Sequence, residues 1–359
     1  HGCGHHLLGA GALGAAIAVK RYLEETGASG SVIYYGCPGE EGGSGKTFMA
    51  RDGVFDELDA AISWHPDDET GVRTKNSLAN CEVLYRFDGI AAHAGIRPDL
   101  GRSALDAVEL MNVGANFLRE HMIPEARVHY AITDAGGSAP NVVQPHAEVL
   151  YLIRAPHSDQ VRHIYERVNN IAHGAALMTG TKTEHTWIKA CSEIVLNNTL
   201  EQLMYEKMLQ IGSPEIIQQD ISFARELTQK ALLSTPAADP AHPIHAEIKP
   251  FHWGEVTPNF GSTDVGDVSW ICPTVQCAAA TWARGTPGHS WQTVSQGKTP
   301  LAYKMMIFAA KAMAATAAGL MDHPEILRKA KEEHQARIGA NGYLCPIPKD
   351  VRPRAIVSL

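Results

Sequence analysis

The sequence lacks the concentrated positive charge with which proteins bind nucleic acids or anionic membranes. Its 31 Lys and Arg residues are outnumbered by 39 Asp and Glu residues, the formal net charge is −8, and no basic cluster occurs along the chain. Binding to phosphate backbones or anionic headgroups depends on such clusters. We therefore expect neither nucleic acid nor a membrane as a partner.

Long apolar runs are also missing. No uninterrupted apolar stretch reaches the roughly 18 residues that a membrane-spanning helix needs. The Ala-rich stretch 307–320 contains Lys311 and is predicted to be a helix packed inside a globular domain.

The seven cysteines do not form a disulfide framework, because their number is odd and their spacing is irregular. They are Cys3, Cys37, Cys81, Cys191, Cys272, Cys277 and Cys345. Scattered cysteines of this kind favour a reducing compartment over secretion. We predict a cytoplasmic protein.

Length and composition indicate a globular protein of two domains. A chain of 359 residues is long for one domain, and 45% hydrophobic and 19% charged residues are ordinary for a soluble fold. The sequence does not start with Met and opens inside a candidate site motif, so we expect the natural protein to extend upstream.

The first part of the chain alternates helix and strand patterns. Residues 7–26 have apolar side chains at helical spacing, and 31–37 form a short β-type run. A short helix over 46–52 and a buried strand over 58–64 follow. This rhythm predicts an α/β domain with a mainly parallel sheet.

A different pattern occupies the middle of the chain. Strands are predicted at 78–87, 126–133, 146–154 and 181–190, with helices at 103–121 and 158–178. This is the β-α-β-β-α-β order of a ferredoxin-like domain. We predict an inserted domain over 76–188, and a larger discontinuous domain over 1–75 and 189–359.

Helix patterns dominate the remainder. They cover 198–209, 220–232, 299–321 and a last helix capped by Asp322, while 274–281 is an apolar strand and 234–258 is loop-like.

Three spots in the larger domain could carry chemistry together. His1-Gly2-Cys3-Gly4-His5 spaces a thiol and an imidazole two residues apart, Glu40-Glu41 stands in a glycine-rich loop, and His65 ends an apolar strand. Neighbours in an extended loop point in different directions, so one carboxylate can bind metal while the other acts as a base. The combination indicates metal-assisted hydrolysis.

The chain resembles the metal-dependent aminoacylase/carboxypeptidase amidohydrolases, in the branch with Cys-Gly-His in place of an aspartate motif. Eight stretches in the right order carry the resemblance. They are 1–9, 38–43, 63–66, 91–95, 141–145, 153–157, 261–270 and 285–291. His6 departs from the pattern, since the family usually has Asp or Asn there.

The resemblance implies a ligand set for two divalent metal ions, Mn²⁺ or Zn²⁺. Its members are Cys3 as the bridging ligand, His5, Glu41, His65 and His289. Glu40 would be the general base for a hydroxide that bridges the two ions. Asp264 and Asp267 could orient a ligand histidine, or Asp264 could cap a helix.

The resemblance also assigns substrate binding to the inserted domain, as a lid or dimerisation domain. His93 would stabilise the transition state, while Asn141 and Arg154 would hold the substrate's carboxylate. In the family these residues reach the metals from a dimer partner or after domain closure. The resemblance further implies main-sheet strands upstream of residue 1.

The implied activity is amide hydrolysis of an N-acyl amino acid, with p-aminobenzoyl-glutamate favoured. A homodimer or a hetero-oligomer with a related A-type subunit is the implied assembly. A dipeptidase, a catalytically silent partner subunit and a purely structural motif without metal remain alternatives. The adjacent base Glu40 argues against a silent subunit.

Overall fold

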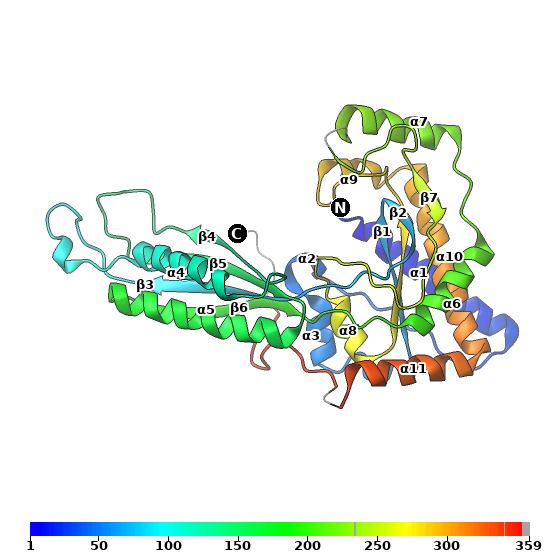
Figure 1. The fold of residues 1–359 in the computed structure, drawn as a ribbon, viewed down its shortest axis with the longest axis horizontal. Helices are drawn as coiled ribbons and strands as arrows, with labels where there is room; N and C mark the ends of the chain where they lie inside the picture. Colours follow the sequence, from blue (N-terminus) through cyan, green and yellow to red (C-terminus); the bar gives the residue numbers. More distant parts are fainter. Residues whose placement is uncertain (233–234, 341, 354–359) are drawn as a thin grey trace.

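The computed structural model describes residues 1–232, 235–340 and 342–353, and it contains two four-stranded sheets that lie side by side along an elongated molecule (Figure 1). The part built on the first sheet is called the large domain below. The part built on the second sheet is called the small domain. The exact boundaries at 76 and 188 remain predictions.

The sheet of the large domain has the strand order β1-β8-β2-β7. Its strands are β1 (Ala61–Asp67), β2 (Glu69–Val72), β7 (His245–Ile248) and β8 (Thr274–Ala280). β1 is parallel to β8 and β2 is parallel to β7, but β2 runs antiparallel to β8. The sheet is thus mainly parallel, with one antiparallel pair, because only Asp68 separates β1 from β2 and the chain must reverse there.

Helices cover this sheet. They are α1 (His5–Thr26), α2 (Glu40–Gly43), α3 (Gly45–Arg51), α6 (Asn198–Ile211), α7 (Gln218–Leu227), α8 (Val265–Ile271), α9 (Trp291–Gln296), α10 (Pro300–Asp322) and α11 (Pro324–Ile338), and a π-helical turn, η3 (Thr228–Leu232), continues α7. β8 is buried along its whole length, as expected for a strand between helices.

Helix α1 packs closely against β1 and so positions the start of the chain. A Cβ on Gly11 would lie 2.7 Å from Trp64 Nε1, so only glycine allows this approach. The indole nitrogen of Trp64 donates to the carbonyl of Leu8 at 2.9 Å.

Helix α10 packs on α1 and β8, as predicted for the Ala-rich stretch. By length and composition alone it could cross a membrane, and 50% of its most apolar window is buried inside the protein. Core helices of soluble proteins have the same properties.

The small domain has the strand order β4-β5-β3-β6, all antiparallel, with two helices on one face. Its elements are β3 (Ala79–Asp88), η1 (Pro98–Leu100), α4 (Ala104–Leu118), η2 (Arg119–His121), β4 (Arg127–Asp134), β5 (His146–Ala155), α5 (Ser158–Thr179) and β6 (Lys182–Cys191). The predicted β-α-β-β-α-β order is confirmed. Strong period-2 burial on β5 and amphipathic helices make this unit readable from sequence.

Several local predictions were wrong. Residues 31–37 form no strand, because no strand of the described chain lies beside them to share a hydrogen-bond ladder. The segment predicted as a loop over 234–258 contains β7. His65 lies inside β1, which continues to Asp67, and His323 rather than Asp322 precedes α11.

Candidate metal centre

Residues 1–5 form a tight turn that places Cys3 just before α1 and His5 at the first position of this helix. Gly4 has φ 73°, and a Cβ there would lie 2.9 Å from the ring of Pro66. His1 Nδ1 accepts hydrogen bonds from the backbone N–H groups of Cys3 and His5, at 3.1 and 3.5 Å. The turn is therefore stabilised by a side chain and requires glycine at one position.

Three other segments of the chain bring side chains next to this opening turn. Glu40 and Glu41 begin the helical turn α2 rather than lying in an extended loop, and His65 comes from β1. His289 has φ 58°, and its backbone N–H donates to the carbonyl of Gly2 at 2.8 Å. This bond ties a segment near the end of the chain to the opening turn.

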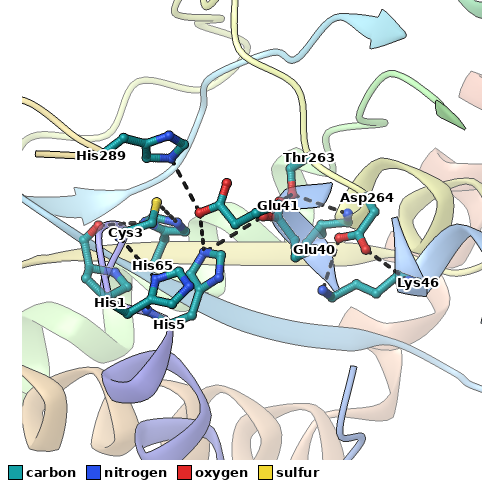
Figure 2. A network of polar contacts seen from close by, with 12 residues as sticks. His1, Cys3, His5, Glu40, Glu41, Lys46, His65, Thr263, Asp264 and His289 are labelled. Carbon is teal, nitrogen blue, oxygen red and sulfur yellow. Dashed lines mark hydrogen bonds and ion pairs between the residues drawn. The ribbon is translucent and has the colours of Figure 1, made fainter. Parts of the chain in front are cut away.

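The five predicted metal ligands lie together in a cluster that Figure 2 shows. Cys3 Sγ is 3.6 Å from His65 Nε2. Glu41 Oε1 is 3.8 Å from His5 Nε2 and 3.4 Å from His289 Nε2. The donor atoms of Cys3, His5 and His65 lie within 4.8 Å of one another, as do those of Cys3, Glu41 and His289.

The charges of the cluster fit a cation. Burial, followed by the nearby carboxylates of Glu41 and Glu40, raises the pKa of the Cys3 thiol to about 12. Burial lowers the pKa of His5, and burial with nearby Arg73 lowers the pKa of His65 to about 3. The imidazoles are thus neutral and able to bind metal, and a divalent ion would supply the positive charge that a thiolate needs. Sulfur, nitrogen and oxygen donors together suit a borderline metal such as zinc and tolerate manganese.

Glu40 lies beside the cluster with few partners of its own. Thr263 Oγ1 donates to Glu40 Oε1 at 3.0 Å, and His5 Nε2 is 3.9 Å from Glu40 Oε2. Burial, Asp264 and Glu41 raise the pKa of this carboxyl group. A carboxylate with a free oxygen next to a metal cluster can accept a proton.

His1 also belongs to this neighbourhood, although the sequence argument did not include it. Its donor atoms lie within 4.8 Å of those of His5 and Glu41, and its ring stacks on that of His5 with centroids 4.5 Å apart. Its Nδ1 already accepts two backbone bonds. We assign it a structural part in the turn.

Neither Asp264 nor Asp267 bonds to a ligand histidine in the described chain. Asp264 stands at the N-cap position of α8 without a side-chain bond to that helix, and its carboxylate instead caps the first turn of α3. Asp264 binds the backbone N–H and the ammonium of Lys46, at 2.9 and 3.0 Å. Asp267 accepts bonds from Thr47, Ser192 and Tyr343. Both carboxylates bind residues at the start of α3, which follows the Glu40–Glu41 turn in the chain. They therefore stabilise the position of that turn and do not orient an imidazole.

The three predicted substrate-binding residues are divided between two places. His93 and Asn141 meet in neighbouring loops, where the N–H of Ala94 donates to the carbonyl of Asn141 at 2.9 Å. These loops lie at the end of the small domain far from α2 (Figure 1). Arg154 lies at the other end of β5, and its guanidinium donates to Ser262 Oγ at 2.9 Å. Asn141 and Arg154 therefore do not meet within this chain.

Sequence reasoning missed the residues that support the cluster from outside. Thr263 and Lys46 contact Glu40 and Asp264, and Lys189 donates to the carbonyl of Glu41. Thr263 stands in a stretch that matched the family pattern. Lys46 and Lys189 have no signal in the sequence, because their contacts arise from packing alone.

His6, where the sequence departs from the family pattern, turns away from the cluster. Its Nε2 lies 2.8 Å from the carbonyl oxygen of Gly297, to which it can donate. It therefore anchors the start of α1 to the turn before α10.

Comparison with known proteins identifies the family that the sequence motifs resemble. A family model described as peptidase family M20/M25/M40 matches residues 1–256. The B-type subunit of p-aminobenzoyl-glutamate hydrolase from Escherichia coli (strain K12) is 50% identical, over 98% of this chain and 77% of its own length. Xaa-Arg dipeptidase of Mus musculus is 27% identical, over 94% and 70%.

Among solved structures, an aminobenzoyl-glutamate utilization protein from Klebsiella pneumoniae is similar, with 19% identity and a TM-score of 0.47. The similarity covers 76% of this chain and 57% of the Klebsiella chain, so this chain spans less than two thirds of that protein.

Proposed function

Because the chain belongs to peptidase family M20/M25/M40, we propose that it hydrolyses the amide bond of an N-acyl amino acid, with p-aminobenzoyl-glutamate as the favoured substrate. The observation that carries the proposal is the cluster of five donors with Glu40 beside it. The relative with 50% identity, named for the hydrolysis of p-aminobenzoyl-glutamate, supports the choice of substrate.

The cluster would hold two divalent ions, Mn²⁺ or Zn²⁺, through Cys3, His5, Glu41, His65 and His289. When bound, such ions polarise the carbonyl of the amide and favour its attack by water.

Glu40 would act first as the general base and then as the general acid in this reaction. Its carboxylate accepts the proton of the attacking water and then gives it to the leaving amine of the amino acid. Thr263 donates to one oxygen of Glu40 and so leaves the other oxygen free for this exchange.

The small domain would bind the amino-acid end of the substrate. Arg154 already lies near the turn that carries Glu40, through its contact with Ser262, and its planar fork suits a carboxylate. His93 and Asn141 would reach the cluster from a second chain or after closure of the small domain. A homodimer or an oligomer with an A-type subunit is therefore part of the proposal, since the relative with 50% identity is itself named as one subunit of a hydrolase.

Glu40→Gln provides the direct test. The substitution keeps the shape of the side chain but removes the base, so we expect kcat for p-aminobenzoyl-glutamate to fall by about 10²–10⁴-fold with metal content unchanged. Glu24→Gln on the exposed face of α1 is the matched control and should keep the full rate. Full hydrolysis by the Glu40→Gln protein with its metals bound would show that the proposed mechanism is wrong.

Dipeptide hydrolysis is the second candidate activity, and the similarity to Xaa-Arg dipeptidase favours it. Protein loaded with Mn²⁺ or Zn²⁺ should be assayed against N-acyl glutamates and against a dipeptide panel. A higher kcat/KM for dipeptides would select the second candidate. Activity that arises only after addition of an A-type subunit would indicate a silent partner instead.

A further inference from the structure

Lys189 joins the small domain to the predicted metal ligand Glu41. It lies on β6, and its ammonium donates to the backbone carbonyl of Glu41 at 2.7 Å. Helix α2 ends at Gly43, only two residues after Glu41, so no N–H of that helix can reach this carbonyl. Lys189 therefore satisfies an acceptor that the short helix leaves open.

The ammonium of Lys189 also forms an ion pair with a carboxylate of the small domain. Glu82 lies opposite Lys189 in the register of β3 and β6, and its Oε2 is 3.6 Å from the ammonium. Both side chains are largely buried, at 15% and 17% exposure. Because both side chains are largely removed from water, the attraction between them is less screened than in a solvent-exposed pair.

The local geometry of β6 directs this side chain toward the large domain. The ladder shifts register between Glu82 and Val83, because Val83 pairs with Trp187 and leaves Ile188 without a partner. Such a bulge twists the strand and changes the direction of the neighbouring side chains. The irregularity therefore stands directly beside Lys189, where β6 approaches α2.

One of the connections between the two domains lies close by. β6 ends at Cys191, and the next residue, Ser192, donates both its N–H and its hydroxyl to Asp267 of the large domain. A rotation of the small domain about this connection would move Lys189 relative to the carbonyl of Glu41.

We propose that Lys189 is a positioning residue that couples the orientation of the small domain to the placement of Glu41 in the cluster. In this role Lys189 acts through the main chain of Glu41 and not through a donor atom of the cluster. The proposal rests on the proposed metal-dependent hydrolysis and adds to it a residue from the other domain.

The test compares Lys189→Met with Lys182→Met, a matched control at the exposed far end of the same strand. Competition with a chelator gives the Kd for Mn²⁺, and kinetics with p-aminobenzoyl-glutamate separate kcat from KM. We expect Lys189→Met to weaken Mn²⁺ binding by about tenfold or more, as for other residues that orient ligands, and to lower kcat with little change in KM. Lys189→Arg should recover part of both, because a guanidinium can donate to the same carbonyl.

Equal Mn²⁺ affinity and kcat in Lys189→Met and Lys182→Met would overturn the proposal. Wild-type protein that binds no metal or hydrolyses no amide would instead contradict the proposed function. In that case hydrogen–deuterium exchange of residues 40–43 decides the positioning role. Faster exchange in Lys189→Met than in Lys182→Met supports it, and equal exchange refutes it.

Discussion

The candidate metal-ligand cluster of the large domain and the loops at the tip of the small domain are assembled over different distances along the chain. Donor atoms from Cys3 to His289 meet within a few ångströms in the cluster. His93 and Asn141, in contrast, lie in two loops of the small domain that are joined by backbone contacts, between His93 and Val142 and between Ala94 and Asn141. The five predicted ligands thus meet within one chain, whereas the proposed roles of His93 and Asn141 require closure of the small domain or a second chain.

The cluster also differs from the tip in its electrostatics. Burial holds the imidazoles of His5 and His65 neutral and keeps the proton on Cys3, so the cluster is arranged for a cation. His93 is exposed, and its Nδ1 accepts hydrogen bonds from the N–H groups of Gly95 and Ile96. A variant in the first region should therefore affect metal binding, and a variant in the second should affect only turnover.

Removal of a cluster ligand should have the largest effect. His65→Ala deletes a buried donor from β1, so we expect loss of at least one metal ion and a fall in hydrolysis of about 10³-fold or more. Added Mn²⁺ should raise the Tm of the wild type but not that of the variant, because ligands stabilise the state that binds them. His242→Ala, at an exposed histidine, is the control. Unchanged metal content in His65→Ala would remove His65 from the ligand set.

His93→Ala should have a smaller effect of a different kind. We expect kcat to fall by about 10²-fold because a donor to the developing oxyanion is lost, while the metal content measured by elemental analysis stays at the wild-type value. A loss of metal in this variant would contradict the separation of the two regions.

Mixing two inactive variants shows how the tip reaches the cluster. If His93 acts on the cluster of a second chain, His93→Ala and Glu40→Gln proteins that exchange subunits should regain part of the wild-type rate. If His93 arrives by closure of its own small domain, the mixture should remain as slow as its components. Recovery of activity thus separates the two arrangements.

Glu201 provides the smallest expected effect and a test outside both regions. It lies on α6 with 1% exposure, and burial raises its pKa to about 7. The folded state therefore binds this proton more tightly than the unfolded chain, so stability falls as the pH rises from about 4.5 through 7. Glu201→Gln should raise the unfolding free energy by on the order of 2 kcal/mol at pH 8.5 and by little at pH 4, with activity unchanged.

Denaturant unfolding at the two pH values measures this difference. Glu206→Gln, an exposed neighbour on the same helix, should show no such dependence. A Glu201→Gln protein that is equally stable relative to wild type at both pH values would show that Arg337 compensates for burial. In either case the result shows how burial affects the stability contributed by a carboxylate that lies outside the cluster.

Much of this arrangement could be predicted from sequence, for identifiable reasons. The small domain has amphipathic helices and alternating strands, so its element order follows from periodicity. Gly4, inside Cys3-Gly4-His5, and Gly39, directly before Glu40-Glu41, both have positive φ and mark the turns that carry the two motifs. Periodicity therefore predicted the fold class, and residue chemistry together with the family resemblance predicted the candidate ligands.

The failed predictions have a common cause. Residues 31–37 have the composition of a strand, but a strand exists only where a neighbour supplies its hydrogen bonds. β2 and β7 are four-residue strands whose pairing depends on each other and on β8, and such short runs carry little periodic signal.

Residue types and their order predicted a site for metal-assisted hydrolysis, and the resemblance to a known family predicted which side chains would bind metal and which would act as the base. The folded chain was needed to show that Cys3, Glu41 and His289 meet, that Asp264 and Asp267 support α3, and that Lys189 reaches Glu41 from the other domain. These contacts join residues far apart in the chain. They depend on packing and strand register, which no local pattern of residues encodes.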